Sequence, residues 1–236
     1  MKDILKKGFE ALKIEYDEIM LDRFKLYYEL LIDYNKKVNL TAITEKNDVA
    51  VKHFLDSVSL LGVCDVDKDV RMIDVGTGAG FPGLPLKIAR GDIKLTLADS
   101  LNKRVEFLKL CVNELGLLDV ECIHSRAEEL AHKQEHREMY DFAVSRAVAN
   151  MATLSEYCIP FLKVGAKFAA FKGPSANDEL ALAKNAIATL GGANACIKAV
   201  NIADYDLSHS IILVDKITNT APKYPRSGNK PLNKPI

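Results

Sequence analysis

The sequence predicts an α/β protein: a doubly wound, mostly parallel sheet of seven strands with a helical extension at its N-terminus. Two observations lead to this fold class. From residue 70 onward, short apolar runs alternate with amphipathic helical segments, which is typical of parallel strands covered by helices on both faces. The last two apolar runs are separated only by residues 203–208, too few for a crossover helix, so these strands pair as an antiparallel hairpin.

Each element rests on its own run of residues. The strands are short apolar runs, expected at 71–75, 94–99, 120–125, 140–145, 166–172, 195–202 and 209–217. The helices between and after them are expected at 82–90, 101–116, 150–162 and 177–191. Upstream, apolar side chains recur every three or four positions and form one helix face: Met20, Phe24, Tyr27, Leu31, Tyr34 and Val38. A further helix is expected at 47–62, with Asn47 as its N-cap and Gly62 as its end.

The pattern divides the chain into a helical unit at 1–63, a core domain at 64–216 and a tail at 217–236. The tail has no acidic residue and four prolines. It is either a mobile terminus or a segment that contacts phosphates. Its basic side chains are therefore candidates for RNA contact: Lys223, Arg226, Lys230 and Lys234.

Composition bounds the class of protein. The chain of 236 residues is 48% hydrophobic and 27% charged, which is enough for an ordinary globular core. Its 32 basic and 32 acidic side chains cancel, whereas a general polyanion binder usually has a basic surplus. Any contact with nucleic acid must therefore come from local patches.

The five cysteines are scattered and form no C-x-x-C pair, which argues against a disulfide framework or a zinc site and favours a reducing compartment. The first residues lack the apolar stretch of a secretory leader, and no run approaches the roughly 20 apolar residues of a spanning helix. We expect a cytoplasmic protein that does not enter a membrane.

A glycine-rich turn follows the first strand, in the stretch MIDVGTGAGFPGLPL at 72–86. Glycine permits positive φ and lets a ligand approach the main chain. Read from Gly76 through Gly78 to Gly80, the spacing is G-x-G-x-G. Read from Gly78, it is G-x-G-x-x-G, which ends at Gly83 and matches the dinucleotide fingerprint. The glycines alone leave both cofactor classes open.

Two aspartates bear on that choice. Asp74 lies at the end of the first strand, where a carboxylate repels a pyrophosphate but suits an ammonium group. S-adenosylmethionine carries an ammonium and a sulfonium and no phosphate. Asp99 ends the second strand, where an acid accepts from ribose hydroxyls of either cofactor. Asp74 therefore favours S-adenosylmethionine over a nicotinamide dinucleotide, the alternative being an oxidoreductase.

Further polar residues end the later strands. Ala127 and Glu128 follow the third strand, where an amide and a carboxylate can read an adenine edge, although an acid there is commonly a helix cap. Arg146 ends the fourth strand and Lys172 the fifth. Because ligands bind outside the carboxyl ends of parallel strands, we expect these side chains to converge on one site.

The segment HKQEH at 132–136 matches the H-x-x-E-H zinc-protease pattern. Two histidines four residues apart could share a helix face and hold zinc. The flanking residues are almost wholly polar, so a solvated helix or loop is expected and no metal site. His53 and His124 are expected to be histidines at the edge of the core.

Several motifs occur in a fixed order: NLTAIT at 39–44, VKHFLDS at 51–57, DVGTGAGFPGLPL at 74–86, DSLNKRVEFL at 99–108, SRAE at 125–128 and SRAVA at 145–149. Together they resemble the bacterial 16S ribosomal RNA guanine-N7 methyltransferases, also called glucose-inhibited division protein B. The resemblance runs over residues 28–172, and the tail YPRSGNKPLNKPI at 224–236 is also similar.

The resemblance implies a Rossmann-like class I methyltransferase that uses S-adenosylmethionine, releases S-adenosylhomocysteine and methylates N7 of one guanine in the decoding region of 16S rRNA. Its partner would be 16S rRNA in the small subunit or in an assembly intermediate. The protein itself is expected to be a monomer. By matching position it assigns the cofactor to Gly76, Phe81, Ala127, Glu128 and Arg146. Arg126 and Lys172 are weaker candidates for the RNA or the target base. No residue is assigned to catalysis with certainty; Arg146, Lys172 and Arg126 are the candidates.

N7 of a neutral guanine carries a lone pair and no proton. In-line methyl transfer to N7 therefore needs no general base. The sequence also shows no evident group of residues that would act as one. The residues alone leave four alternatives open: a methyltransferase acting on another RNA, one acting on a small molecule, a nicotinamide-dependent oxidoreductase, and an RNA-binding module in ribosome assembly.

Overall fold

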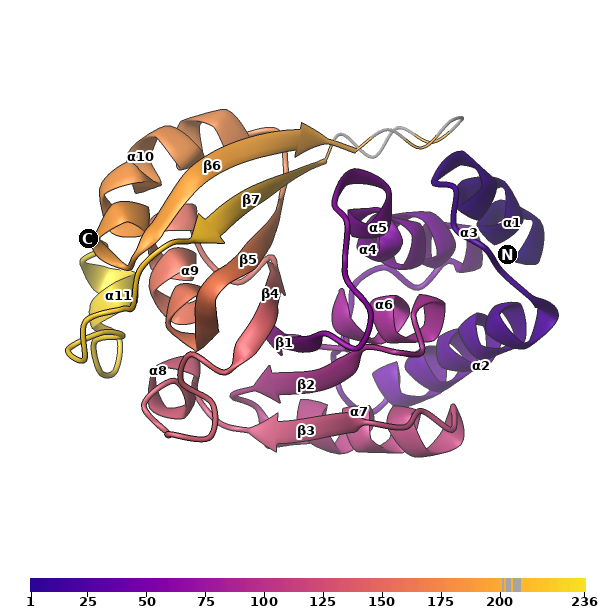
Figure 1. Cartoon of the computed structure of the whole chain (residues 1–236). Helices are drawn as coiled ribbons and strands as arrows, with labels where there is room; N and C mark the ends of the chain where they lie inside the picture. The colour runs from indigo at the N-terminus through magenta and orange to yellow at the C-terminus, as the bar shows by residue number, and fades with distance from the viewer. Residues whose placement is uncertain (201, 203–204, 206–208) are drawn as a thin grey trace.

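The computed structural model describes residues 1–236 except 201, 203–204 and 206–208, and its strands form one seven-stranded sheet with helices on both faces (Figure 1). The order across the sheet is β3-β2-β1-β4-β5-β7-β6. The strands are β1 Arg71–Val75, β2 Lys94–Asp99, β3 Val120–His124, β4 Tyr140–Arg146, β5 Leu162–Lys172, β6 Gly192–Ala199 and β7 Ser210–Lys216. The expected fold class is confirmed.

Strands β1 to β5 run parallel, and β7 pairs antiparallel with both β5 and β6. The expected terminal hairpin is therefore present, although most of its turn, 203–208, lies outside the described residues. The chain leaves β1 toward β2 on one side and returns through β4 on the other. This topological switch point is where the carboxyl ends of β1 and β4 leave room for a ligand.

The helices are α1 Lys2–Ala11, α2 Glu18–Asn35, α3 Lys46–Val49, α4 Asp56–Val58, α5 Leu60–Val63, α6 Gly83–Ala89, α7 Asn102–Glu114, α8 Ala127–Leu130, α9 Met151–Cys158, α10 Ala176–Thr189 and α11 Lys230–Asn233. A π-helical stretch, Ala50–Leu55, joins α3 to α4. Within the described chain, no helix is long and apolar enough to cross a membrane.

Two helix boundaries differ from expectation. The helical run expected at 47–62 begins at Lys46 and continues to Val63, so neither Asn47 nor Gly62 marks an end. Gly62 instead allows close packing of this helix against Leu12, because a Cβ on Gly62 would lie 2.8 Å from Leu12 Cδ2. Helix α2 does have a side-chain cap, since Asp17 accepts a hydrogen bond of 2.7 Å from the amide of Met20.

The fifth strand also differs. It starts at Leu162, earlier than the expected 166, and includes Gly165 at φ 93°. The helix expected to reach residue 162 ends at Cys158 and passes into a short 3-10 turn, Ile159–Phe161. Pro160 accounts for the early end, because proline has no amide hydrogen and cannot continue the hydrogen-bond ladder of the helix.

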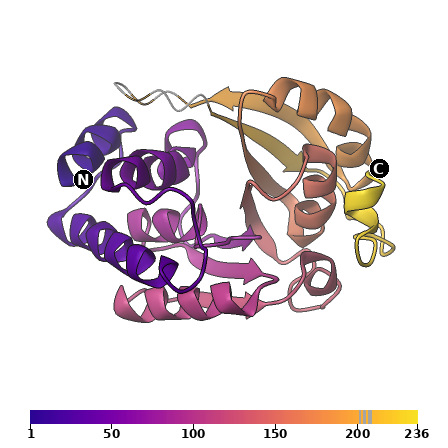
Figure 2. The ribbon, with the colours of Figure 1, turned by 180° about the vertical axis from the view of Figure 1, so that it is seen from behind.

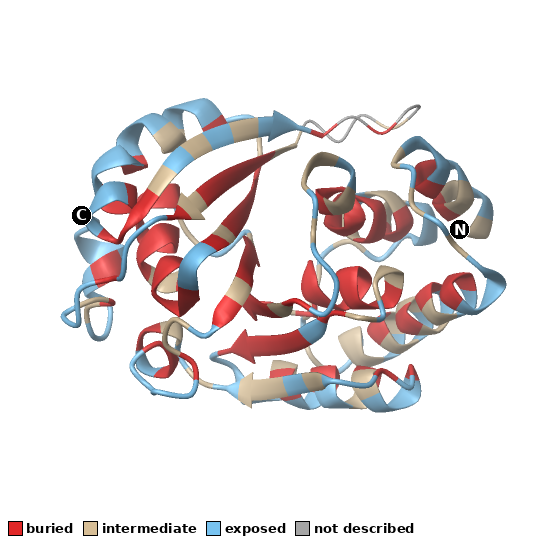
Figure 3. Ribbon diagram, viewed as in Figure 1, coloured by how far each residue is buried: buried red, intermediate tan, exposed pale blue. Residues whose placement is uncertain are grey.

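The sheet buries a different set of side chains on each face, and alternate strand residues supply the two sets. Met72, Leu97 and Val144 pack with α1, α2, α6 and α7, whereas Ile73 and Ala143 pack with α9 and α10. Figure 2 shows the two helix groups from behind, and Figure 3 shows their buried sides turned toward the sheet. The N-terminal helices therefore share one core with the sheet.

Tyr27 on α2 connects the N-terminal helices to the glycine-rich turn. It is fully buried, and its hydroxyl donates a 2.5 Å hydrogen bond to the carbonyl of Ala79. Its ring stacks on Phe54 at a centroid distance of 5.3 Å and lies 5.5 Å from Phe81. The turn after β1 is thus held by a helix that lies more than forty residues upstream.

We predict that Tyr27→Phe lowers the free energy of unfolding by about 1 kcal/mol, because it leaves the buried carbonyl of Ala79 without its donor. Urea unfolding followed by circular dichroism measures this. The matched control is Tyr34→Phe, which keeps an aromatic contact with Phe107 and removes a hydroxyl that has no hydrogen bond within the described structure. Equal losses in both variants would contradict the role given to Tyr27.

Candidate active site

The glycine-rich turn follows β1, and each of its glycines is required for a different structural reason. Gly76, Gly78 and Gly80 have φ of 70°, 62° and 101°. A Cβ on Gly76 would meet Val148 at 2.6 Å, and one on Gly80 would meet the Tyr27 hydroxyl at 2.6 Å. At Gly78 a Cβ would meet nothing within 4 Å, so here the bare backbone faces open space. Gly80, an expected cofactor contact, lines neither of the two cavities described below.

Asp74, at the end of β1, supports this turn through hydrogen bonds to two of its residues. Its side chain is fully buried, and Oδ2 accepts hydrogen bonds from the Thr77 hydroxyl at 2.6 Å and the Gly83 amide at 2.8 Å. Burial raises the pKa of Asp74 to about 7, against the effect of these two bonds. The carboxylate lines neither cavity. Asp74, expected to receive an ammonium group, thus lies where it braces the turn.

The side chain of Asp74 also explains why residue 83 is a glycine. A Cβ on Gly83 would lie 2.8 Å from Asp74 Oδ2, so only glycine lets α6 start this close to β1. The third glycine of the G-x-G-x-x-G spacing therefore serves helix packing. Asp74 Oδ1 has no hydrogen-bond partner among the described residues, although it is buried.

Asp99 supports the turn from the side. It ends β2 and is almost completely buried. Oδ2 accepts a 2.9 Å hydrogen bond from the Gly78 amide, and Oδ1 accepts one of 2.9 Å from Leu101. Arg104 approaches Oδ2 at 3.5 Å. Asp99 also lines the smaller of two cavities, as expected for a residue that meets a ligand.

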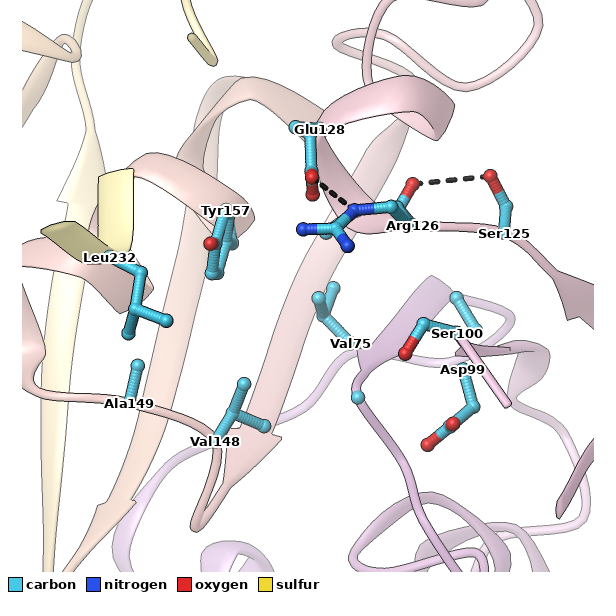
Figure 4. Close-up of a pocket in the computed structure, with 13 residues that line it drawn as sticks. Val75, Asp99, Ser100, Ser125, Arg126, Glu128, Val148, Ala149, Tyr157 and Leu232 are labelled. Carbon is cyan, nitrogen blue, oxygen red and sulfur yellow. Dashed lines mark hydrogen bonds and ion pairs between the residues drawn. The ribbon is translucent and has the colours of Figure 1, made fainter. Parts of the chain in front are cut away.

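The smaller cavity, of about 220 Å³, lies between the ends of β1, β2 and β3 (Figure 4). Glu128 closes its far side; this carboxylate is almost fully buried, and its Oε1 accepts a hydrogen bond from Nε of Arg126. Ala127 lines the cavity beside it. The other walls are largely apolar and include Tyr157 and Leu232. Two buried carboxylates at the ends of an apolar slot are suited to a flat ligand with hydrogen-bond donors at both ends.

The larger cavity, a cleft of about 890 Å³, adjoins the first and shares Gly76, Val148 and Ala149 with it. Its lining comes from the N-terminal helices, the glycine turn, the ends of β4 and β5, and His209, which precedes β7. Phe81 lies on this cleft. The two cavities form one trough along the carboxyl edge of the sheet.

Arg146 is held in the wall of the cleft. Its Nη1 donates to Asp56 Oδ2 at 2.5 Å and to the carbonyl of Lys52 at 3.2 Å, and its guanidinium lies 5.0 Å from the centre of the Phe81 ring. His209 contacts the other oxygen of Asp56 at 2.9 Å. Burial opposes ionisation, but His209 and Arg146 together lower the pKa of Asp56. The hydrogen bond to Asp56 raises the pKa of His209.

His53 lies in the same wall. Its ring stacks on Phe81 at 4.4 Å, and Nε2 is 2.8 Å from the Thr41 hydroxyl. Burial, with the charge of Arg146, lowers the pKa of His53 to about 4. The sequence interpretation missed His53, Asp56 and His209. A signal was available for the first two, because residues three apart on a helix lie on one face.

Lys172 and Arg126, the weaker candidates, are both engaged within the protein. Lys172 Nζ donates to the carbonyl of Ala149 at 2.6 Å and pairs with Glu179 at 2.8 Å, which steadies the turn after β4. Arg126 bridges Glu128 and Asn229. Lys172 nevertheless lines the cleft and Arg126 the smaller cavity.

The tail is packed against the body and is not a free arm. Arg226 pairs with Glu156, which is fully buried, at 2.7 Å, and the hydroxyl of Thr153 donates to the carbonyl of Pro231 at 2.9 Å. The mobile-terminus interpretation is therefore wrong, and the guanidinium of Arg226 is occupied by Glu156. The remaining RNA candidates of the tail are exposed: Lys223, Lys230 and Lys234.

The two histidines of the segment 132–136 do not face each other. The segment forms turns; His132 Nε2 contacts the carbonyl of Pro225 at 2.8 Å, and His136 Nδ1 contacts the Tyr140 hydroxyl at 2.7 Å. Among the described residues, no group of three or more histidine, cysteine or acidic side chains could hold a metal ion.

Comparison with known proteins adds to this geometry. Residues 20–208 match the model of a family described as GidB, rRNA small subunit methyltransferase G. The chain is 49% identical to "Ribosomal RNA small subunit methyltransferase G" of Clostridium perfringens (strain 13 / Type A), over 99% of this chain and 98% of that protein. It is 48% identical to the protein of the same name from Alkaliphilus metalliredigens, over 100% and 98%.

Solved structures agree on the fold. A SAM-dependent O-methyltransferase from Thermotoga maritima has a TM-score of 0.53 at 15% identity, covering 81% of this chain and 72% of that one. A protein from Corynebacterium glutamicum has a TM-score of 0.55 at 14% identity, covering 92% and 97%. At these identities the likeness concerns the fold alone.

We predict that Asp74→Asn changes how stability depends on pH. Burial raises the pKa of Asp74 from 3.8 to about 7, so near neutral pH the folded chain keeps a proton that the unfolded chain releases. The stability from that proton is complete below about pH 4 and is lost as the pH rises through about 7, with a slope of at most about 1.4 kcal/mol per pH unit. The variant lacks this slope.

Urea unfolding at several pH values between about 5 and 8 measures the difference between the two slopes. Asp33→Asn, which removes an exposed carboxylate, is the control and should keep the wild-type slope. If wild type and Asp74→Asn give parallel curves, Asp74 does not keep a proton in this range.

Proposed function

The chain belongs to the family of rRNA small subunit methyltransferase G, and on this premise we propose that it transfers a methyl group from S-adenosylmethionine to N7 of one guanine in 16S rRNA. The observation that supports this most strongly is the trough at the switch point, whose narrow end lies between buried Asp99 and Glu128. Its wide end leaves room for a nucleobase beside Phe81 and Arg146.

The residues of the smaller cavity fit an adenosine. The hydroxyls of ribose and the amine of adenine are hydrogen-bond donors, and each cavity end offers a carboxylate, Asp99 or Glu128. The apolar walls suit the face of a purine. The cofactor supplies, when bound, a methyl group on a positively charged sulfur. Acceptors and negative charge around the turn favour such a ligand over a phosphate.

A nicotinamide dinucleotide fits less well. Its pyrophosphate would lie against the turn beside Asp99, whose buried carboxylate accepts from the Gly78 amide, and a carboxylate there repels phosphate. The third glycine of its fingerprint, Gly83, is used for helix packing against Asp74. The oxidoreductase alternative therefore has no support beyond the glycine spacing.

The larger cleft would hold the target guanine. N7 has no proton to remove, so the task of the wall is to hold the base against the methyl group and to exclude water, which contributes several kcal/mol by positioning alone. Arg146, fixed by Asp56 and the Lys52 carbonyl, and Lys172, fixed by Glu179, provide rigid donors there. The low pKa of His53 leaves its ring neutral at pH 7.

The RNA must present this guanine outside a helix, because N7 lies in the narrow major groove of A-form RNA, which side chains do not reach. Exposed Lys223, Lys230 and Lys234 on the tail are candidates to hold the surrounding phosphates. We further expect a monomer that acts in the cytoplasm on the small subunit or on an assembly intermediate.

We predict that Gly78→Ala weakens binding of S-adenosylhomocysteine about tenfold or more, because the added methyl stands on the face of the turn that meets the ligand. Gly116→Ala is a matched control. Both glycines have φ near 60° and open space around a Cβ, so both variants carry a similar backbone strain, but Gly116 lies in the turn before β3. Calorimetric titration measures both affinities; equal weakening would place the ligand elsewhere.

We predict tritium transfer from labelled S-adenosylmethionine into 16S rRNA at one guanine, located by borohydride and aniline cleavage followed by primer extension. His53→Gln and His209→Gln should each retain turnover within about tenfold, because loss of a general base typically costs 10²–10⁴-fold. A methyl group at another atom than N7 would refute the proposed reaction. A loss of about a hundredfold or more in either variant would refute the mechanism.

A further inference from the structure

The last twenty residues form part of the smaller cavity, a role that the proposed reaction does not by itself require. Residues 217–236 follow β7 and include α11, which packs against α9 (Figure 1). Arg137 donates to the carbonyls of Tyr224 and Thr220 at 2.8 Å each, and Arg226 pairs with buried Glu156. These contacts fix the segment ahead of Asn229 and Leu232, and Arg226 Nη2 also donates to the carbonyl of Lys234 at 2.9 Å, beyond them.

Asn229 belongs to this segment and touches Arg126. Arg126 Nη2 donates to Asn229 Oδ1 at 2.9 Å. Its Nε donates to Glu128 (Figure 4). The Arg126 side chain is 44% exposed, whereas that of Glu128 is 4% exposed. In the part of the chain that the structure describes, Arg126 is the only side chain that donates to Glu128. Asn229 therefore holds a partly exposed side chain in the orientation in which it pairs with this carboxylate.

Leu232 supplies a piece of wall. It lies across the cavity from Glu128, near Tyr157 and Ala149, although about half of its surface is otherwise exposed (Figure 4). A leucine in this position covers the face of a flat ligand without offering it a hydrogen bond. The segment thus contributes both an apolar cover and the positioning of a polar end.

We propose that residues 217–236 set how tightly and how selectively the cavity holds an adenine ring, with Leu232 covering the ring and Asn229 acting as a positioning residue through Arg126 on Glu128. This inference rests on the proposed cofactor. Its chemical consequence is specific. Adenine presents an amine that donates to the Glu128 carboxylate. Hypoxanthine presents a carbonyl at the same place, and two acceptor oxygens cannot form a hydrogen bond with each other.

Calorimetry with S-adenosylhomocysteine and S-inosylhomocysteine tests this in the full-length chain. Asn229→Ala should weaken the adenine ligand between about two- and tenfold, the effect of one net hydrogen bond, and leave the hypoxanthine ligand unchanged. Asn229→Asp keeps an acceptor for Arg126 and should restore wild-type preference. Leu232→Ala should weaken both ligands by a similar factor, because it removes apolar cover alone.

Asn233→Ala is the control on the same short helix, because Asn233 is exposed and does not line the cavity. In turnover, Asn229→Ala should raise the KM for S-adenosylmethionine and leave the KM for RNA at its wild-type value. Melting temperatures equal to wild type show that the variants are folded.

Unchanged affinities and an unchanged adenine preference in both Asn229→Ala and Leu232→Ala overturn the inference. If the wild-type chain binds neither nucleoside, the proposed cofactor itself is contradicted, and not only the role of residues 217–236. The two failures are therefore distinguishable in one set of titrations.

Discussion

The turn after β1 depends on two buried carboxylates that hold it from different sides. Asp74 fixes the Thr77 hydroxyl and the start of α6 at Gly83, and Asp99 fixes the amide of Gly78. Hydrogen bonds to buried carboxylates are strong, and losing one partner is costly. The turn therefore keeps its shape before any ligand arrives, and we propose that the Asp99 carboxylate beside it disfavours a ligand that carries phosphate.

The active site is completed by parts of the chain that lie far from this turn in sequence. Tyr27 on α2 supports the carbonyl of Ala79, and Asp56 fixes Arg146 at the end of β4. The N-terminal helices share one apolar core with the sheet, so the cleft wall that they form is rigid. On the opposite side the tail brings Leu232 to the smaller cavity.

Much of the fold follows from local patterns, because alternating apolar runs and a six-residue spacer leave few topologies. The strand ends predicted the sheet edge along which Asp99 and Glu128 both lie. The sequence could not show that Asp74 is turned under the loop, since this depends on how closely Gly83 approaches it. Nor could it bring His209 to Asp56, because that contact joins residues 153 positions apart through the tertiary fold.

The central claim is that this braced turn accepts a nucleoside that carries an amino-acid group and no phosphate. Calorimetric titration of the purified chain with S-adenosylhomocysteine and, separately, with NADH tests it most directly. The account predicts saturable heat at one site per chain with the first ligand and none with the second. Saturable uptake of NADH together with no heat from S-adenosylhomocysteine would contradict it.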